Sequence, residues 1–371
     1  MKKPSIPQLT SIRFFLIAYI VIAHFIKFGT QNEFLLKLFS QQNVVVGAFF
    51  VLSGYIMAYV YTEFHSSEMR PIEPMKFFKN RLFRLYPTYF FILLLFSPMF
   101  IYIEVYYKHG ASIFWHALTV LTLTQAWFPS LGELWNSPTW FLSATLFAYA
   151  LFPFLIQVIC KKERKSLLKL LFAVFSVSIV IKILYSYSCG WNVMEGVTSP
   201  SSIITFNFIR FNPVINVLEF IMGISMARLL MLSKVEKRLY FPGLILTALC
   251  SILLIRTFFN VNDMLTRSAV FIPLFLFFLT HLHQSKGLLT QILSNRFCVY
   301  LGEISFSIYI VHGAIGQLFY KKVMKNLLFT QSVNIFIYYS VVLLASILLY
   351  HGVEKKVAVL LKKLSGKVAT N

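Results

Sequence analysis

The feature that most constrains this chain is a succession of apolar segments, each long enough, or nearly so, to cross a bilayer as a helix. They cover residues 11–30, 43–61, 86–107, 139–160, 167–188, 213–232, 240–258, 267–283, 298–320 and 334–353. Only 13% of the 371 residues are charged, whereas soluble domains are about 25% charged. The sequence therefore predicts an all-α integral membrane protein with about ten transmembrane helices.

One further apolar run, 112–127, is shorter and amphipathic, and its placement decides the orientation of everything after it. If it does not cross, basic residues gather in alternate loops, as the positive-inside rule requires of cytoplasmic loops. These residues are Arg70, Lys76, Lys79, Arg81, Arg84, Lys161, Lys162, Arg164, Lys165, Lys234, Lys237, Arg238, Lys286, Arg296, Lys355, Lys356, Lys362, Lys363 and Lys367. We therefore expect both termini in the cytoplasm and an interfacial or re-entrant helix at 112–127 on the outer side.

Lys321, Lys322 and Lys325 are exceptions, because this orientation places them outside. The cytoplasmic loops account for most of the net charge of +21, so the basic excess indicates membrane topology and not nucleic-acid binding. Lys2 and Lys3 precede a first span that lacks a small-residue cleavage site, which predicts a retained helix instead of a removed signal peptide.

The cysteines Cys160, Cys189, Cys250 and Cys298 are widely spaced and show no Cys-x-x-Cys pattern. No histidine lies beside them at metal-ligand spacing, so we expect free thiols and no bound metal. No internal repeat or long linker is visible. A single membrane domain is therefore expected at 1–355, followed by a basic cytoplasmic tail at 356–371.

Two polar side chains interrupt the first span, where a charged group costs about 2.5–3.5 kcal/mol on insertion scales. Arg13 and His24 are eleven residues apart, or three helical turns plus about 20°, so both lie on one helix face about 16 Å apart along the axis. Arg13 can snorkel to headgroups and His24 can bond to a neighbouring helix. Alternatively, both face a cavity that carries chemistry.

Small and basic residues mark the second span and the segment after it. Residues 47–55 include two glycines, an alanine and a serine, which permit close helix approach or local unwinding. Arg81 and Arg84 lie on one face of a helix that is expected to end at Pro87. Such a pair suits a phosphate or pyrophosphate through bidentate hydrogen bonds, although a positive-inside anchor would have the same sequence.

Over nearly the whole chain, this combination resembles the membrane acyltransferase family 3, whose members O-acylate sugars. Arg13 and His24 match the family's basic-x10-His motif, 47–55 its aromatic-Leu-Ser-Gly-aromatic segment, and 81–87 its Arg-x-x-Arg-aromatic-Pro segment. Further matches are 138–143 to its Trp-x-Leu-Ser opening, 211–223 to its Glu-Phe-x-x-Gly helix, and 300–312 to its Leu-Gly-x-Ser-Tyr-x-x-Tyr-x-x-His segment. Two departures stand out. Thr145 stands where many members have Glu, and the proline that usually follows Glu354 is absent.

The resemblance implies an enzyme of the bacterial cytoplasmic (inner) membrane, with no bound cofactor. It would transfer acetyl from acetyl-CoA to a hydroxyl of a cell-surface polysaccharide, lipopolysaccharide or lipid-linked glycan. Neutral His24 would be the general base for the hydroxyl, and Arg13 would hold the CoA pyrophosphate or polarise the thioester carbonyl. The residues expected at the donor site are Arg81, Arg84, Ser53 and Gly54.

A second set of polar residues is assigned to the acceptor side or to structure, namely Trp140, Ser143, Glu219, Tyr309 and His312. Ser143, like Ser53, can carry an acyl group or simply pack between helices. Glu219 is expected to pair with a basic neighbour, Arg210 or Arg13. His312 is either a packed histidine or a polar group for the acceptor. The alternative function is a transporter or flippase for a glycan or small anion, which intramembrane Arg and His would serve equally well.

Overall fold

The computed structural model describes residues 6–63, 68–108, 112–188, 207–233, 240–259, 263–319 and 330–360. Over these ranges the chain is helical and has no strand, apart from one isolated bridge between Thr62 and Met69. The predicted all-α fold is therefore confirmed. Several expectations lie outside the described residues, namely those for Lys2, Lys3, Cys189, Lys234, Lys237 and Arg238, for the lysines at 321, 322 and 325, and for the tail beyond 360.

Nine helical segments in these ranges are long and apolar enough to cross a membrane. They are built on α1 (Pro7–Phe25), α3 (Gln42–Tyr61), α4 (Pro74–Lys108), α6 (Trp140–Cys160), α7 (Arg164–Ser188), α9 (Pro213–Leu232), α12 (Ile272–Gln284), α14 (Arg296–Leu318) and α15 (Gln331–Leu349). A tenth apolar helix, α10 (Pro242–Phe258), has 17 residues, a length of about 26 Å. This is close to the thickness of a hydrocarbon core, so the prediction of about ten spans is confirmed.

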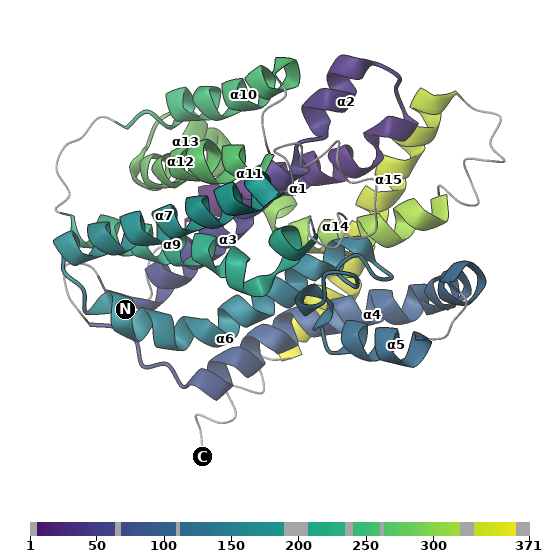
Figure 1. Ribbon diagram of the computed structural model, residues 1–371, viewed down its shortest axis with the longest axis horizontal. Helices are drawn as coiled ribbons and strands as arrows, with labels where there is room; N and C mark the ends of the chain where they lie inside the picture. The colour runs from purple at the N-terminus through teal and green to yellow at the C-terminus, as the bar shows by residue number, and fades with distance from the viewer. Residues whose placement is uncertain are drawn as a thin grey trace.

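The apolar run at 112–127 forms the short helix α5 (Ile113–Leu121) and a 3-10 turn, η2 (Gln125–Trp127). Nine residues are too few to cross a bilayer as a helix. α5 lies beside α4 (Figure 1), where the Tyr89 hydroxyl donates a hydrogen bond to the Val120 carbonyl oxygen at 2.7 Å. It exposes Phe114 and Trp115. A short helix with an exposed apolar face agrees with the predicted interfacial helix.

The expectation of a helix that ends at Pro87 is wrong. α4 continues from Pro74 to Lys108 with Pro87 and Pro98 inside it. A proline removes one backbone hydrogen bond, but in membrane helices neighbouring groups can satisfy the freed carbonyl. Arg81 and Arg84 consequently stand on the same continuous helix as the span that follows them.

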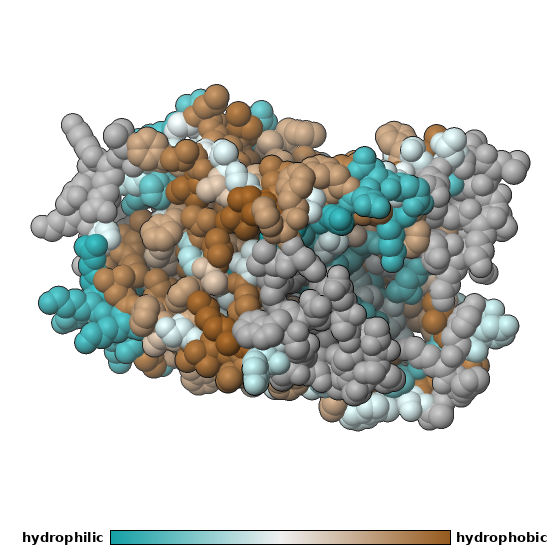
Figure 2. All heavy atoms as spheres, turned by 45° about the horizontal axis from the view of Figure 1, so that its top comes forward, coloured by the Kyte–Doolittle hydropathy of each residue, from teal (hydrophilic) through white to brown (hydrophobic). Residues whose placement is uncertain are grey.

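Two hydrophobic clusters fill the interior. One is centred on α3 and α9 and includes α6 and α12, while the other combines α4, α14 and α15 with part of α1. α9 packs beside α3, α6 and α7, and α1 packs against α14 (Figure 1). Hydrophobic side chains also cover much of the left half of the face that Figure 2 shows. Phe49 of α3 and Phe141 of α6 contact both clusters and mark the seam between them.

Glycines bring α3 and α9 into direct backbone contact. A Cβ atom on Gly54 would fall on the carbonyl oxygen of Phe220, and one on Gly223 would fall on that of Val51. Because backbone atoms cannot swing aside as a side chain can, a larger residue would push the helices apart. Gly54 therefore serves helix packing, as small residues do in many membrane helix pairs.

Replacing Gly223 by leucine should destabilise the protein by at least roughly 1–3 kcal/mol, because the side chain overpacks the α3–α9 contact. Unfolding in mixed detergent micelles, followed by circular dichroism, measures this loss. Gly243→Leu is the matched control, since nothing lies within 4 Å of a Cβ atom at that position. Equal stability of the two variants would contradict the role of this contact.

Candidate active site

A cavity of about 550 Å³ opens at the seam between the two clusters. Its lining comes from α1, α3, α4, α6, α14 and the π-helix η6 (Tyr350–Glu354). Along α3 the lining extends from Val46 to Val60, a rise of about 21 Å. The cavity is therefore long enough to hold different chemical groups at its two ends.

Three guanidinium groups gather at one end, which we call the arginine end. Arg81 and Arg84 come from the first turns of α4, Arg13 comes from α1, and both α4 residues act electrostatically on Arg13. Arg81 also lies over the ring of Tyr149 of α6, 5.8 Å from the centroid. Within the described ranges, no carboxylate forms an ion pair with any of the three arginines. Grouped cations of this kind suit an anionic ligand, and guanidiniums suit phosphate in particular.

Carboxylates and hydroxyls line the cavity near these arginines. Glu354 accepts a hydrogen bond from the Ser307 hydroxyl at 2.9 Å, and Glu303 accepts one from the Tyr350 hydroxyl at 2.9 Å. Tyr350 and Glu354 both belong to η6 and both line the cavity. Sequence reasoning treated Glu354 only as part of a terminal motif and did not place it in the site.

Two hydroxyl side chains face the middle of the cavity, Ser53 of α3 and Thr145 of α6. The Thr145 hydroxyl is buried and has no hydrogen-bond partner within the described part of the chain. Thr145 stands two residues after Ser143, at one of the two positions where the sequence departs from the pattern of the family that it resembles. Ser143 is buried but is not among the lining residues.

Two histidines meet beyond the opposite end, which we call the histidine end. His24 Nδ1 lies 3.0 Å from His312 Nε2, and the two rings are nearly parallel, with 3° between their planes. His24 follows the lining residue Ile20 by four positions, and His312 follows the lining residue Tyr309 by three. The pair therefore stands one helical turn beyond the cavity lining.

Hydrogen bonds assign the protons of this pair. His312 Nδ1 lies 2.7 Å from the carbonyl oxygen of Tyr309, and because a carbonyl oxygen can only accept, Nδ1 carries the proton. In the neutral ring, Nε2 of His312 is then an acceptor, so His24 Nδ1 must donate to it. A neutral His24 consequently has its lone pair on Nε2, which is the atom that can take a proton from a substrate.

Burial distinguishes the two histidines. His312 is completely buried, whereas His24 is only partly buried. Two hydrogen bonds hold the backbone around His312: the Tyr338 hydroxyl donates to the His312 carbonyl at 3.0 Å, and the Asn136 amide donates to the Ile310 carbonyl at 2.9 Å. The Tyr309 hydroxyl donates to the Pro138 carbonyl and so ties the side chain of this neighbouring residue to the start of α6. His312 is thus placed to orient a ring, and His24 is placed to meet a ligand.

The structure brings together five of the eleven predicted site residues in one cavity. Those that line one cavity are Arg13, Arg81, Arg84, Ser53 and Tyr309. Gly54 instead packs against α9, and Trp140 packs its ring against Phe211 with centroids 4.8 Å apart. Neither is among the lining residues.

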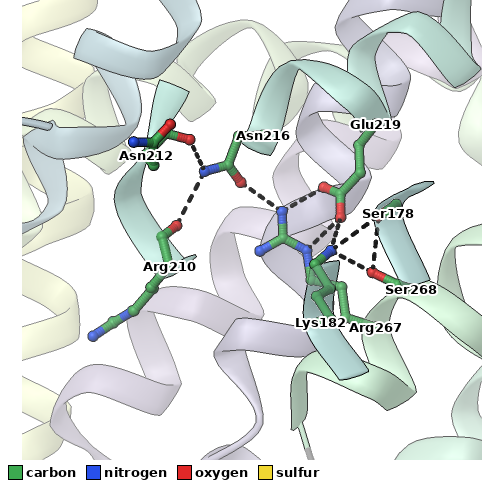
Figure 3. Close-up of polar contacts among 8 residues, drawn as sticks. All are labelled: Ser178, Lys182, Arg210, Asn212, Asn216, Glu219, Arg267 and Ser268. Atoms are coloured by element: carbon green, nitrogen blue, oxygen red, sulfur yellow. Dashed lines mark hydrogen bonds and ion pairs between the residues drawn. The ribbon is translucent and has the colours of Figure 1, made fainter. Parts of the chain in front are cut away.

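Glu219 also lies away from the cavity lining, and neither predicted partner binds it. Its carboxylate accepts from Arg267 Nε at 2.7 Å and from Lys182 Nζ at 3.2 Å, and a second Arg267 nitrogen also contacts it (Figure 3). Arg210 pairs with Glu133 at 3.0 Å instead, and Arg13 faces the cavity. Lys182 and Arg267 were missed, although each is a basic residue in or at the edge of a predicted apolar span.

The charge cluster around Glu219 joins three helical elements. Lys182 comes from α7, Glu219 from α9, and Arg267 from the π-helix η4 (Thr266–Phe271). The side chains of all three are at most 2% exposed. Arg267 also donates to Asn216 at 2.7 Å, and Lys182 contacts the hydroxyls of Ser178 and Ser268 (Figure 3). Two cations therefore share one carboxylate in the interior.

Among the described residues, no group of three or more His, Cys, Asp or Glu side chains is close enough together to hold a metal ion.

Comparison with known proteins gives two matches. A family model described as an acyltransferase domain matches residues 6–351. The acyltransferase MdmB of Streptomyces mycarofaciens is 25% identical over 317 residues, a match that covers 83% of this chain and 78% of that protein. No solved structure gives a significant match.

Proposed function

The chain belongs to the acyltransferase family 3, and from this premise we propose that it transfers acetyl from acetyl-CoA to a carbohydrate hydroxyl. The acceptor is a cell-surface polysaccharide, lipopolysaccharide or lipid-linked glycan, and the enzyme works in the inner membrane of a bacterium. The observation that carries this proposal is the convergence of Arg13, Arg81 and Arg84 on one cavity that leads towards a pair of histidines.

The arginine end is the site for the phosphates of CoA. Arg13 and His24 are eleven residues apart on α1, a rise of about 16 Å. Arg13 is therefore too far from His24 to polarise a carbonyl that reacts beside it. This distance favours phosphate binding by Arg13, with the pantetheine arm extending through the cavity towards the histidine end.

The same arrangement supports the proposed orientation. Arg81 and Arg84 lie in the N-terminal part of α4, whose first two turns also carry Lys76 and Lys79. The positive-inside rule supports a cytoplasmic location for this end of the helix, where acetyl-CoA is supplied. The acceptor then approaches from the outer side, where His24 lies.

At the histidine end, His24 acts as the general base. The hydroxyl oxygen attacks the thioester carbonyl carbon while its proton moves to His24 Nε2. The carbon–sulfur bond then breaks, and the CoA thiolate takes the proton back from Nε2 and leaves as the thiol. His312 is a positioning residue, because it accepts the His24 Nδ1 hydrogen and so keeps the Nε2 lone pair available.

Replacing Arg84 by alanine should weaken acetyl-CoA binding about 10–100-fold, since a charge-assisted hydrogen bond contributes about 1.5–3 kcal/mol. Isothermal titration of the purified protein in detergent measures this change, and the affinity of the wild type should fall as salt rises. Arg164→Ala is the control, because Arg164 is exposed at the start of α7. Unchanged affinity in the Arg84 variant would contradict a phosphate site at the arginine end.

A further inference from the structure

Three aromatic rings line the cavity between the arginine end and the histidine pair. The ring of Phe141 lies 5.7 Å from that of Phe49 and 5.7 Å from that of Tyr309, measured between centroids. Both contacts are edge-to-face, with the planes at 70° and 69°, an arrangement that aromatic pairs prefer. All three residues line the cavity. We call them the aromatic collar.

The two phenylalanines of the collar turn part of their surface to the cavity. In α3, residues 43–48 and 50–52 are buried while Phe49 is only partly buried. In α6, residues 142–146 are buried while Phe141 is only partly buried. Because both phenylalanines line the cavity, their exposed surface is surface that a ligand in the cavity would touch.

The rings of the collar cannot easily move aside. Phe141 also packs against Phe50, with centroids 4.7 Å apart, and both collar phenylalanines contact the two hydrophobic clusters. The Tyr309 hydroxyl donates to the Pro138 carbonyl. Tyr309 also contacts the histidine pair, since its ring centroid lies 5.7 Å from that of His312.

We propose that the aromatic collar limits the length of the acyl group, so that the donor is a CoA thioester of a short-chain acid. This inference rests on the proposed function. With its phosphates at the arginine end, the donor must carry its thioester to the collar before the carbonyl meets a hydroxyl beside His24. Each extra methylene would then have to displace a packed ring. Hydrophobic pockets discriminate by about 10–200-fold per methylene.

Binding of acetyl-, butyryl-, hexanoyl- and octanoyl-CoA to the purified full-length protein in lipid nanodiscs tests the collar, with free CoA as the reference. The wild type should bind acetyl-CoA at least about tenfold more tightly than octanoyl-CoA. In Phe141→Ala this ratio should shrink about tenfold or more, while the affinity for free CoA stays unchanged. Phe154→Ala is the matched control, because Phe154 lies on α6 but is 57% exposed.

Phe141→Leu and Phe49→Leu are milder changes on the two sides of the seam. Each should also reduce the preference for acetyl-CoA over CoA thioesters with longer acyl chains, but by less than Phe141→Ala. A Phe141 variant that binds free CoA normally but keeps the wild-type preference for short acyl chains would overturn the proposed role of the collar. A wild-type protein that binds octanoyl-CoA as tightly as acetyl-CoA would do the same. If the wild type binds no CoA compound, the CoA donor of the proposed function is contradicted as well.

Discussion

Replacing His24 by alanine should lower the rate of acetyl transfer about 10²–10⁴-fold, the usual contribution of a positioned general base. Affinity for acetyl-CoA should change little, because the arginine end lies about 16 Å away along α1. Transfer of labelled acetyl from acetyl-CoA to glycan in isolated membranes measures the rate. Titration of the same purified variant with acetyl-CoA measures the affinity.

His281→Ala serves as the control, since His281 lies on α12 and accepts a hydrogen bond from the Phe241 backbone. A double variant tests whether His312 acts only through His24. Because His312 acts through His24, adding His312→Ala to His24→Ala should lower the rate no further. Undiminished acetylation by the His24 variant would remove it as the base. A further loss in the double variant would show that His312 has a role of its own.

Replacing Glu219 by glutamine should destabilise the protein by roughly 3–5 kcal/mol, because it leaves two buried cations without a counter-charge. Lys182→Met is the informative comparison. It leaves Arg267 and Glu219 as a balanced pair, so its cost should be clearly smaller. Unfolding free energies of both variants in mixed micelles test this order. A Glu219 variant that is as stable as the Lys182 variant would contradict a cluster organised around the single carboxylate.

The sequence was sufficient to predict the spans and the polar face of α1. Apolar length and loop charge depend on local composition, and they identified the helices and excluded 112–127 as a crossing. The helical repeat likewise placed Arg13 and His24 on one face. In the structure Arg13 lines the cavity, and His24 lies one helical turn beyond its lining. These features needed no knowledge of which helices are neighbours.

The errors share a physical origin, because each depends on contacts between distant segments. The partners of Glu219 lie on α7 and η4, and the sequence does not state that these elements meet. Gly54 was assigned to the donor, but its neighbour is the backbone of α9. Pro87 was taken as a helix end, although groups on packed helices can stabilise a proline inside a span.

The hydrogen bond from His312 to the carbonyl of Tyr309 has a consequence for proton movement. An amide carbonyl has no proton to pass on, so the chain of hydrogen bonds from His24 stops inside the helix that carries it. A proton accepted by His24 Nε2 can therefore leave only through that same nitrogen. The histidine pair therefore does not conduct protons across the membrane. Acyl transfer at this site would return each proton to the departing thiol, and it would neither draw on nor dissipate a proton gradient.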